Sequence, residues 1–167
     1  ELDQTNNEIY KQVMRGDVYN LNIYEGDYME FNPKYFDIEV FDVIIGNPPY
    51  QKNNKDGSYG SSIPFYNEFV EKSIKFGNKV MFITPSRWFA GGKGLDKFRK
   101  NMLSRTDIKF IKHYPNSKEV FSHVDIKGGV NVLFIDNNNE DLCKFVVNKM
   151  EFYIDISQYD IISDPKY

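Results

Sequence analysis

The sequence lacks the features that mark several classes of protein. It contains one cysteine, Cys143, which excludes an intrachain disulfide and leaves no cysteine cluster for zinc. No stretch approaches the ~20 apolar residues that a transmembrane helix needs. The polar, acidic start of the chain has no signal-peptide pattern. We therefore expect no membrane partner, no bound metal and an intracellular, reducing compartment.

The chain has no excess of positive charge. Lysine and arginine together number 21 against 24 aspartates and glutamates, which gives a net charge of −3. This balance argues against a dedicated nucleic-acid-binding module. It does not exclude an enzyme that binds DNA through another part of the protein.

The remaining composition is that of a globular protein. The chain has 167 residues, of which 41% are hydrophobic and 27% charged, enough for one domain with a core. Cys143 lies in an alternating apolar segment, so we expect it to be a small core residue.

Helical and strand patterns alternate along the chain. Apolar spacing predicts helices over residues 3–14, 63–76 and 94–103. Strands are predicted over residues 21–24, 41–46, 79–84, 108–114, 130–135 and 143–147, the last beside 130–135. A polar segment, 51–62, is expected to be a mobile loop. Strand–helix alternation predicts an α/β fold with a mostly parallel sheet and helices on both faces.

The most informative segment follows the strand at 41–46. Asn47, Pro48, Pro49 and Tyr50 form an extended turn, because each proline fixes φ and removes a backbone donor. The backbone carbonyls and the Asn47 amide oxygen are then free to accept hydrogen bonds, and Tyr50 adds an aromatic face. Such a site suits a planar group that bears an NH2. Ligands of parallel sheets bind at the carboxyl ends of strands, where Asn47 lies.

Asn47-Pro48-Pro49-Tyr50 after Asp-Val-Ile-Ile-Gly resembles the catalytic motif of the S-adenosylmethionine-dependent amino-methyltransferases. These enzymes modify adenine N6, cytosine N4 or a protein glutamine. Residues 84–88, Thr-Pro-Ser-Arg-Trp, are similar to restriction–modification methyltransferases of the Eco57I-like kind. The resemblance implies a Rossmann-like fold, S-adenosylmethionine as cofactor and double-stranded DNA as partner, in the cytoplasm of a bacterium or archaeon.

The resemblance also implies roles for other residues. Glu1 matches the acidic residue that binds the cofactor's ribose, and Asp27 matches the aspartate that accepts the adenine amino group. Asn47 is implied at the cofactor as well. Phe121, in Ser117–Phe121, matches a second aromatic that stacks on the target base opposite Tyr50. Three of these residues also have a simpler interpretation. Glu1 can be a solvated terminal residue, Asp27 an aspartate that closes a turn, and Phe121 a core phenylalanine.

One family feature is absent. The glycine-rich cofactor loop after the first strand is nowhere in the sequence, and no recognition domain or nuclease motif is visible. Residues 1–150 are therefore expected to be a partial catalytic domain without its first strand, followed by an extension, 151–167. Parent segments carrying the missing N-terminal part, a recognition domain or a nuclease are expected partners. Alone, the chain is expected to bind cofactor poorly and to be inactive.

Three functions remain open on this evidence. The leading interpretation is an adenine-N6 DNA methyltransferase of a restriction–modification system. The second is a protein-glutamine methyltransferase, because a glutamine amide is also a planar NH2 group. The third is a methyltransferase fold that binds no cofactor, for which the missing glycine loop is the best support.

Overall fold

The computed structural model describes residues 24–52 and 62–162, and the chain divides into two units, 1–39 and 40–167. Glu1, the predicted helix at 3–14 and all but Tyr24 of the strand predicted at 21–24 lie outside the described residues. In the first unit, a 3-10 turn, η1 (Pro33–Phe36), begins after Asn32, whose side chain accepts a hydrogen bond from the Lys34 amide. An aromatic cluster of Tyr24, Phe31 and Tyr35 packs beside it.

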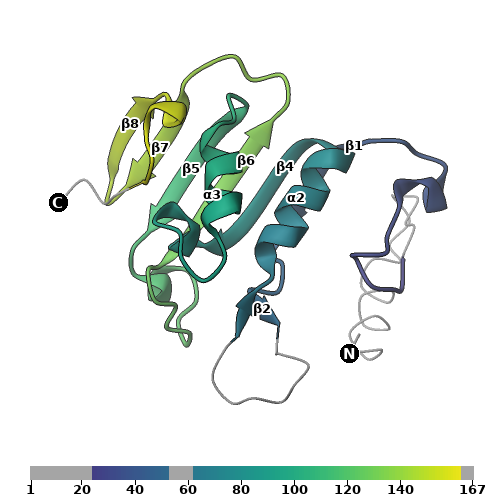
Figure 1. The fold of residues 1–167 in the computed structure, drawn as a ribbon, viewed down its shortest axis with the longest axis horizontal. Coiled ribbons are helices and arrows are strands. Elements are labelled where there is room, and N and C mark those ends of the chain that lie inside the picture. The colour runs from purple at the N-terminus through teal and green to yellow at the C-terminus, as the bar shows by residue number, and fades with distance from the viewer. Residues whose placement is uncertain (1–23, 53–61, 163–167) are drawn as a thin grey trace, which may run out of the picture. The chain divides into compact units, whose positions relative to one another are not determined.

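The second unit is built on a mixed sheet of six strands, in the order β1-β4-β6-β5-β7-β8 (Figure 1). Its strands are β1 (Phe41–Gly46), β4 (Gly77–Pro85), β5 (Ile108–Tyr114), β6 (Val130–Asp136), β7 (Cys143–Val147) and β8 (Met150–Ile154). β1, β4, β5 and β7 run in one direction, while β6 and β8 are antiparallel to their neighbours. The carboxyl ends of four strands therefore lie at one edge of the sheet, which is the edge where β1 ends at the proline turn.

Two helices, α2 (Tyr66–Phe76) and α3 (Asp96–Leu103), pack on the same face of this sheet (Figure 1). In α2, Tyr66, Val70 and Ser73 are buried at helical spacing. Val80 and Phe82 of β4 alternate toward the same core. Both helices connect parallel strands by crossovers that advance in the same direction. Since such crossovers are almost always right-handed, both helices fall on one face.

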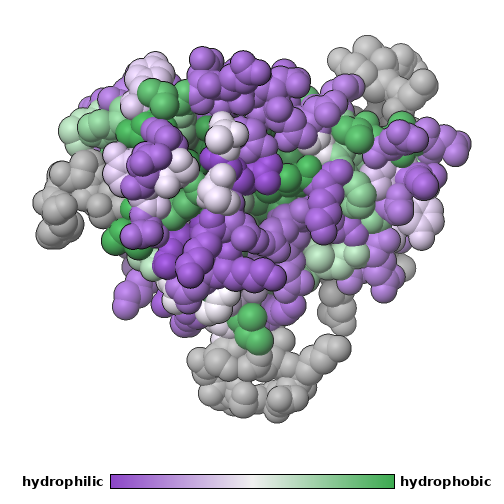
Figure 2. Space-filling view, turned by 45° about the horizontal axis from the view of Figure 1, so that its top comes forward, coloured by the Kyte–Doolittle hydropathy of each residue, from purple (hydrophilic) through white to green (hydrophobic). Residues whose placement is uncertain are grey.

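The other face of the sheet is not covered by a helix of the described residues. One lateral row crosses all six strands in register, and its side chains are at least partly exposed: Ile45, Met81, Phe134, Phe110, Lys144 and Tyr153. Helices were predicted on both faces of the sheet. Within residues 40–52 and 62–162, helices cover one face only. Figure 2 shows hydrophilic side chains over much of the surface, with hydrophobic patches between them.

Most predicted elements are confirmed, with shifts at their ends. The helix predicted at 63–76 begins only at Tyr66, because Ile63–Pro64 forms β3, which pairs with β2 (Gln51–Lys52) in a two-residue ladder. The segment 51–62 is therefore not loop throughout; 53–61 lie outside the described residues. Residues 143–147 were predicted to pair beside β6, and this prediction is wrong. They pair with the free edge of β5, because β6 is already flanked by β4 and β5.

Two further expectations concern the C-terminal part. Cys143 is 3% exposed, which confirms it as a core residue, and burial raises the pKa of its thiol to about 12. β8 continues the sheet from Met150, across the boundary expected at residue 150. The division into a catalytic part, 1–150, and an extension, 151–167, stays a prediction.

Candidate functional site

The candidate site begins where β1 ends. β1 pairs in parallel with β4, and Gly46 lies opposite Phe82. A Cβ atom at Gly46 would lie 2.9 Å from the Phe82 ring, so glycine allows the two strands to approach before the turn. The next residues alternate in exposure: Asn47 is exposed, Pro48 buried and Pro49 exposed. The buried Pro48 anchors the turn while Asn47 stays accessible.

The polar groups of this turn are open to a ligand. The Asn47 side chain and the Pro48 carbonyl make no hydrogen bond to any residue in the part of the chain that the structure describes. The Tyr50 carbonyl, in contrast, accepts a hydrogen bond from the Phe65 amide at 3.1 Å, which fixes the far end of the turn beside α2. Two acceptors are therefore held on a backbone that cannot form a sheet ladder.

Tyr50 and Phe121, which the family resemblance pairs, lie together in the structure. Their ring centroids are 6.4 Å apart and their planes meet at 69°, an edge contact. The Tyr50 hydroxyl is buried with no hydrogen-bond partner among the described residues. Burial raises the pKa of this hydroxyl to about 12. Tyr50 thus adds an aromatic ring to the turn, and its buried hydroxyl is neutral and has no hydrogen-bond partner among the described residues.

A buried polar network supports the same edge of the sheet. The Asn131 amide nitrogen donates to the Thr84 carbonyl at 3.1 Å and to the Ser86 hydroxyl at 3.3 Å. The Ser86 Oγ also lies 2.9 Å from His113 Nδ1. Asn131 and Thr84 are almost fully buried, at 0% and 1% exposed. Sequence reasoning did not find this network, although a polar Asn131 inside the apolar strand 130–135 was a signal.

We expect Asn131→Ala to lower the free energy of unfolding by about 2–3 kcal/mol, because it leaves buried partners on Thr84 and Ser86 unsatisfied. Urea unfolding followed by circular dichroism measures the change. Asn138→Ala is the matched control, since Asn138 is exposed in the turn after the same strand, and a change within about 0.5 kcal/mol is expected there. Equal effects of the two substitutions would contradict a structural role for the network.

Of the two acidic residues predicted to bind the cofactor, the structure describes Asp27 but not Glu1. Asp27 lies in the first unit, is exposed, and accepts a hydrogen bond from the Met29 amide through Oδ1 at 2.8 Å. Its backbone carbonyl accepts the Glu30 amide, so Asp27 closes a turn. Oδ2 has no partner among the described residues and is available to an amino group. Glu1 lies outside the described residues.

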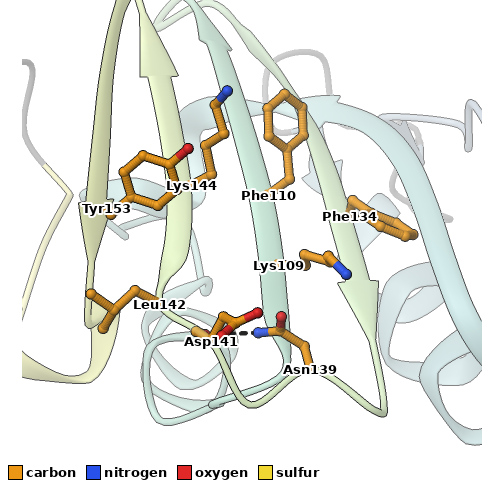
Figure 3. A pocket seen from close by; sticks show the side chains of 8 residues that line it. All are labelled: Lys109, Phe110, Phe134, Asn139, Asp141, Leu142, Lys144 and Tyr153. Atoms are coloured by element: carbon orange, nitrogen blue, oxygen red, sulfur yellow. Dashed lines mark hydrogen bonds between the residues drawn. The ribbon is translucent and has the colours of Figure 1, made fainter.

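Described residues of the second unit line pockets on its sheet. One, of about 580 Å³, lies on the face away from the helices (Figure 3) and is lined by Lys109, Phe110, Phe134, Asn139, Asp141, Leu142, Lys144 and Tyr153. The other, of about 670 Å³, is at the carboxyl ends of β5 and β7; its lining includes Lys112, His113, Tyr114 and Lys149. Only the second shares the sheet edge of Asn47. Within residues 24–52 and 62–162, no cluster of three or more His, Cys, Asp or Glu side chains is placed to hold a metal ion.

Comparison with known proteins identifies the family of the chain. A family model described as Eco57I restriction-modification methylase matches residues 1–121. An uncharacterized adenine-specific methylase of Mycoplasma pneumoniae is 35% identical over 126 residues, which are 71% of this chain and 29% of that protein. The chain therefore spans less than a third of the curated relative that it matches.

Two solved structures share the fold. A chain of a type I restriction–modification system matches with a TM-score of 0.54 at 14% identity, covering 75% of this chain and 27% of that one. The type IIG restriction endonuclease BpuSI matches with a TM-score of 0.50 at 16% identity, covering 72% and 16%. At these identities the likeness concerns the fold alone.

The fold is thus a mixed α/β sheet of the kind found in restriction–modification proteins, with an Asn-Pro-Pro-Tyr turn at a strand end. The chain belongs to the Eco57I restriction-modification methylase family. In the described part of the chain, no helix has the length and apolar character to cross a membrane.

Proposed function

We propose that this chain is part of the catalytic domain of a DNA methyltransferase that transfers a methyl group from S-adenosylmethionine to adenine N6. The observation that carries the proposal is that the Asn47 amide and the Pro48 carbonyl, next to Tyr50, have no hydrogen-bond partner among the described residues. Membership of a family of adenine-specific methylases supports the choice of adenine.

In this proposal the target adenine leaves the duplex, because its N6 cannot be reached inside the base stack. Asn47 Oδ1 and the Pro48 carbonyl accept hydrogen bonds from the two hydrogens of N6. These bonds draw the amino group toward tetrahedral geometry and raise the electron density of its lone pair. Tyr50 stacks on the ring and holds N6 at the acceptors. Catalysis at this site is then mostly positioning.

The residues present fit S-adenosylmethionine in their donor and acceptor chemistry. The free Oδ2 of Asp27 is an acceptor for the cofactor's adenine amino group, and the Glu1 carboxylate is an acceptor for ribose hydroxyls. When bound, the cofactor would supply an activated methyl group on a positively charged sulfur, which would leave as the neutral thioether. N6 would release one proton to solvent after the transfer, so no strong general base is required of the protein.

A DNA partner is consistent with the lysines at this edge. Lys112 and Lys149 line the pocket at the carboxyl ends of β5 and β7 and form no ion pair with a described residue. Glu151, on the same rim, is paired with Lys144 at 2.8 Å. Lys112 Nζ lies 4.9 Å from the centroid of the Tyr114 ring, a contact that does not neutralise its charge. Positive charges of this kind can bind phosphate groups, which supply much of the affinity of proteins for DNA.

The test is a methylation assay with the full natural chain, labelled S-adenosylmethionine and unmethylated genomic DNA. We expect N6-methyladenine among the digested nucleosides, identified by mass spectrometry. Label in N4-methylcytosine would show that cytosine is the methyl acceptor. Label in a glutamine of a protein substrate would show that the acceptor is a glutamine. Absence of cofactor binding by calorimetry would instead indicate a fold without catalytic activity.

A further inference from the structure

Phe121 is held in place by a compact turn between β5 and β6. The Phe121 amide donates to the Ser117 carbonyl at 2.8 Å, and the Phe121 carbonyl accepts from the Val124 amide at 3.1 Å. Both bonds to Phe121 thus come from within the segment 117–126. The position of its ring depends on how firmly this segment keeps its shape.

Ser117 cross-links that segment. Its Oγ donates to the Val124 carbonyl at 2.9 Å and accepts from the Ile126 amide at 2.9 Å. Ser117 is 2% exposed, and its two hydrogen bonds are partly buried. A buried hydroxyl with two backbone partners joins the start of the turn to its end, and Phe121 lies between them.

The turn also sets where the Phe121 ring lies relative to Tyr50. A planar base between two parallel rings needs about 3.5 Å on each side, or roughly 7 Å between the ring planes. The Tyr50 and Phe121 centroids are 6.4 Å apart with planes at 69°, so the two rings are close but not parallel. Stacking of a base on both rings therefore requires the Phe121 ring to reorient, and the turn keeps this ring beside Tyr50 while it does so.

We propose that Ser117 is a positioning residue that acts through Phe121: its cross-link keeps Phe121 beside Tyr50, where the Phe121 ring stacks on the target base. This inference rests on the proposed function, because the base is the expected guest of the Tyr50–Phe121 pair. Ser117 itself does not touch the base.

A double-mutant cycle tests this role in the full natural chain. Ser117→Ala is expected to weaken binding of DNA with an extrahelical target adenine about three- to tenfold, the size of one lost hydrogen bond. In a Phe121→Ala background the same substitution is expected to change the affinity less than about twofold, because its route of action is gone. An equal loss in both backgrounds, or no loss in either, would overturn the proposal.

A second measurement separates this inference from the proposed function. Nuclear Overhauser contacts between the Tyr50 and Phe121 rings, in selectively labelled protein without DNA, are expected in the unmodified chain and weakened strongly by Ser117→Ala. Ser104→Ala is the matched control, since within the described part of the chain its hydroxyl bonds only the Asn101 carbonyl, at the surface. The ring contacts should persist in this variant. Ring contacts that survive Ser117→Ala would overturn the positioning role even if adenine is methylated. Loss of the contacts without any methylation would retain it while the proposed function fails.

Discussion

Asn47→Ala should lower the rate of methyl transfer by at least about 10²- to 10³-fold, while the affinity for S-adenosylmethionine changes by no more than a few-fold. The expected size is that of removing one preorganised hydrogen-bonding group from a reacting centre. In the structure the Asn47 amide is exposed and makes no hydrogen bond to a described residue. Its loss therefore removes a contact to substrate without breaking one within the protein.

Single-turnover methylation of DNA and calorimetric titration of the cofactor measure the two quantities in the full natural chain. Asn138→Ala serves as the control, because Asn138 is an exposed asparagine at the opposite edge of the same sheet. It should leave the rate unchanged. Retained turnover in Asn47→Ala would exclude the proposed role of the amide, and lost cofactor affinity with retained turnover at saturation would move Asn47 to the cofactor.

The sequence predicted the parts of the fold that depend on local patterns. Residues 41–46 and 108–114 are apolar or alternating over a strand length, and both are strands with those bounds. Local patterns did not predict which strands pair with each other. The segment 143–147 was placed beside β6, but strand order depends on which sheet edge remains free, and this is decided by the whole topology.

The same distinction applies to the site. Tyr50 and Phe121 were paired through a family resemblance, and the structure brings their rings together. The contribution of Ser117 was not predicted, because its importance arises from two backbone groups seven and nine residues away. Asn131 bonds Thr84 and Ser86, which precede it by 47 and 45 positions in the chain. No local pattern encodes such bonds, which exist only after the strands have paired.

Tyr50→Ala should weaken binding of DNA with an extrahelical target adenine about five- to 150-fold, the affinity equivalent of the 1–3 kcal/mol of one base–aromatic stack. Tyr50→Phe and Tyr50→Trp should retain most of the affinity, because stacking needs a π face and not a hydroxyl. Fluorescence anisotropy with such DNA compares the variants. If phenylalanine were as damaging as alanine, the hydroxyl would have a hydrogen-bonding role in the complex.

The buried hydroxyl adds a pH dependence that separates the two variants further. Burial raises the pKa of Tyr50 from 10.0 to about 12, so the folded state favours the neutral phenol more than the unfolded state does. The resulting stability is complete below pH 10 and is lost as the pH rises toward 12. Tyr50→Phe has no proton to lose at this position, and it also removes a hydroxyl that has no partner among the described residues. Its free energy of unfolding should therefore fall less than that of the unmodified chain between pH 9 and 11, which urea unfolding at each pH would measure. An identical alkaline loss in both proteins would mean that the Tyr50 hydroxyl is solvated in the folded state.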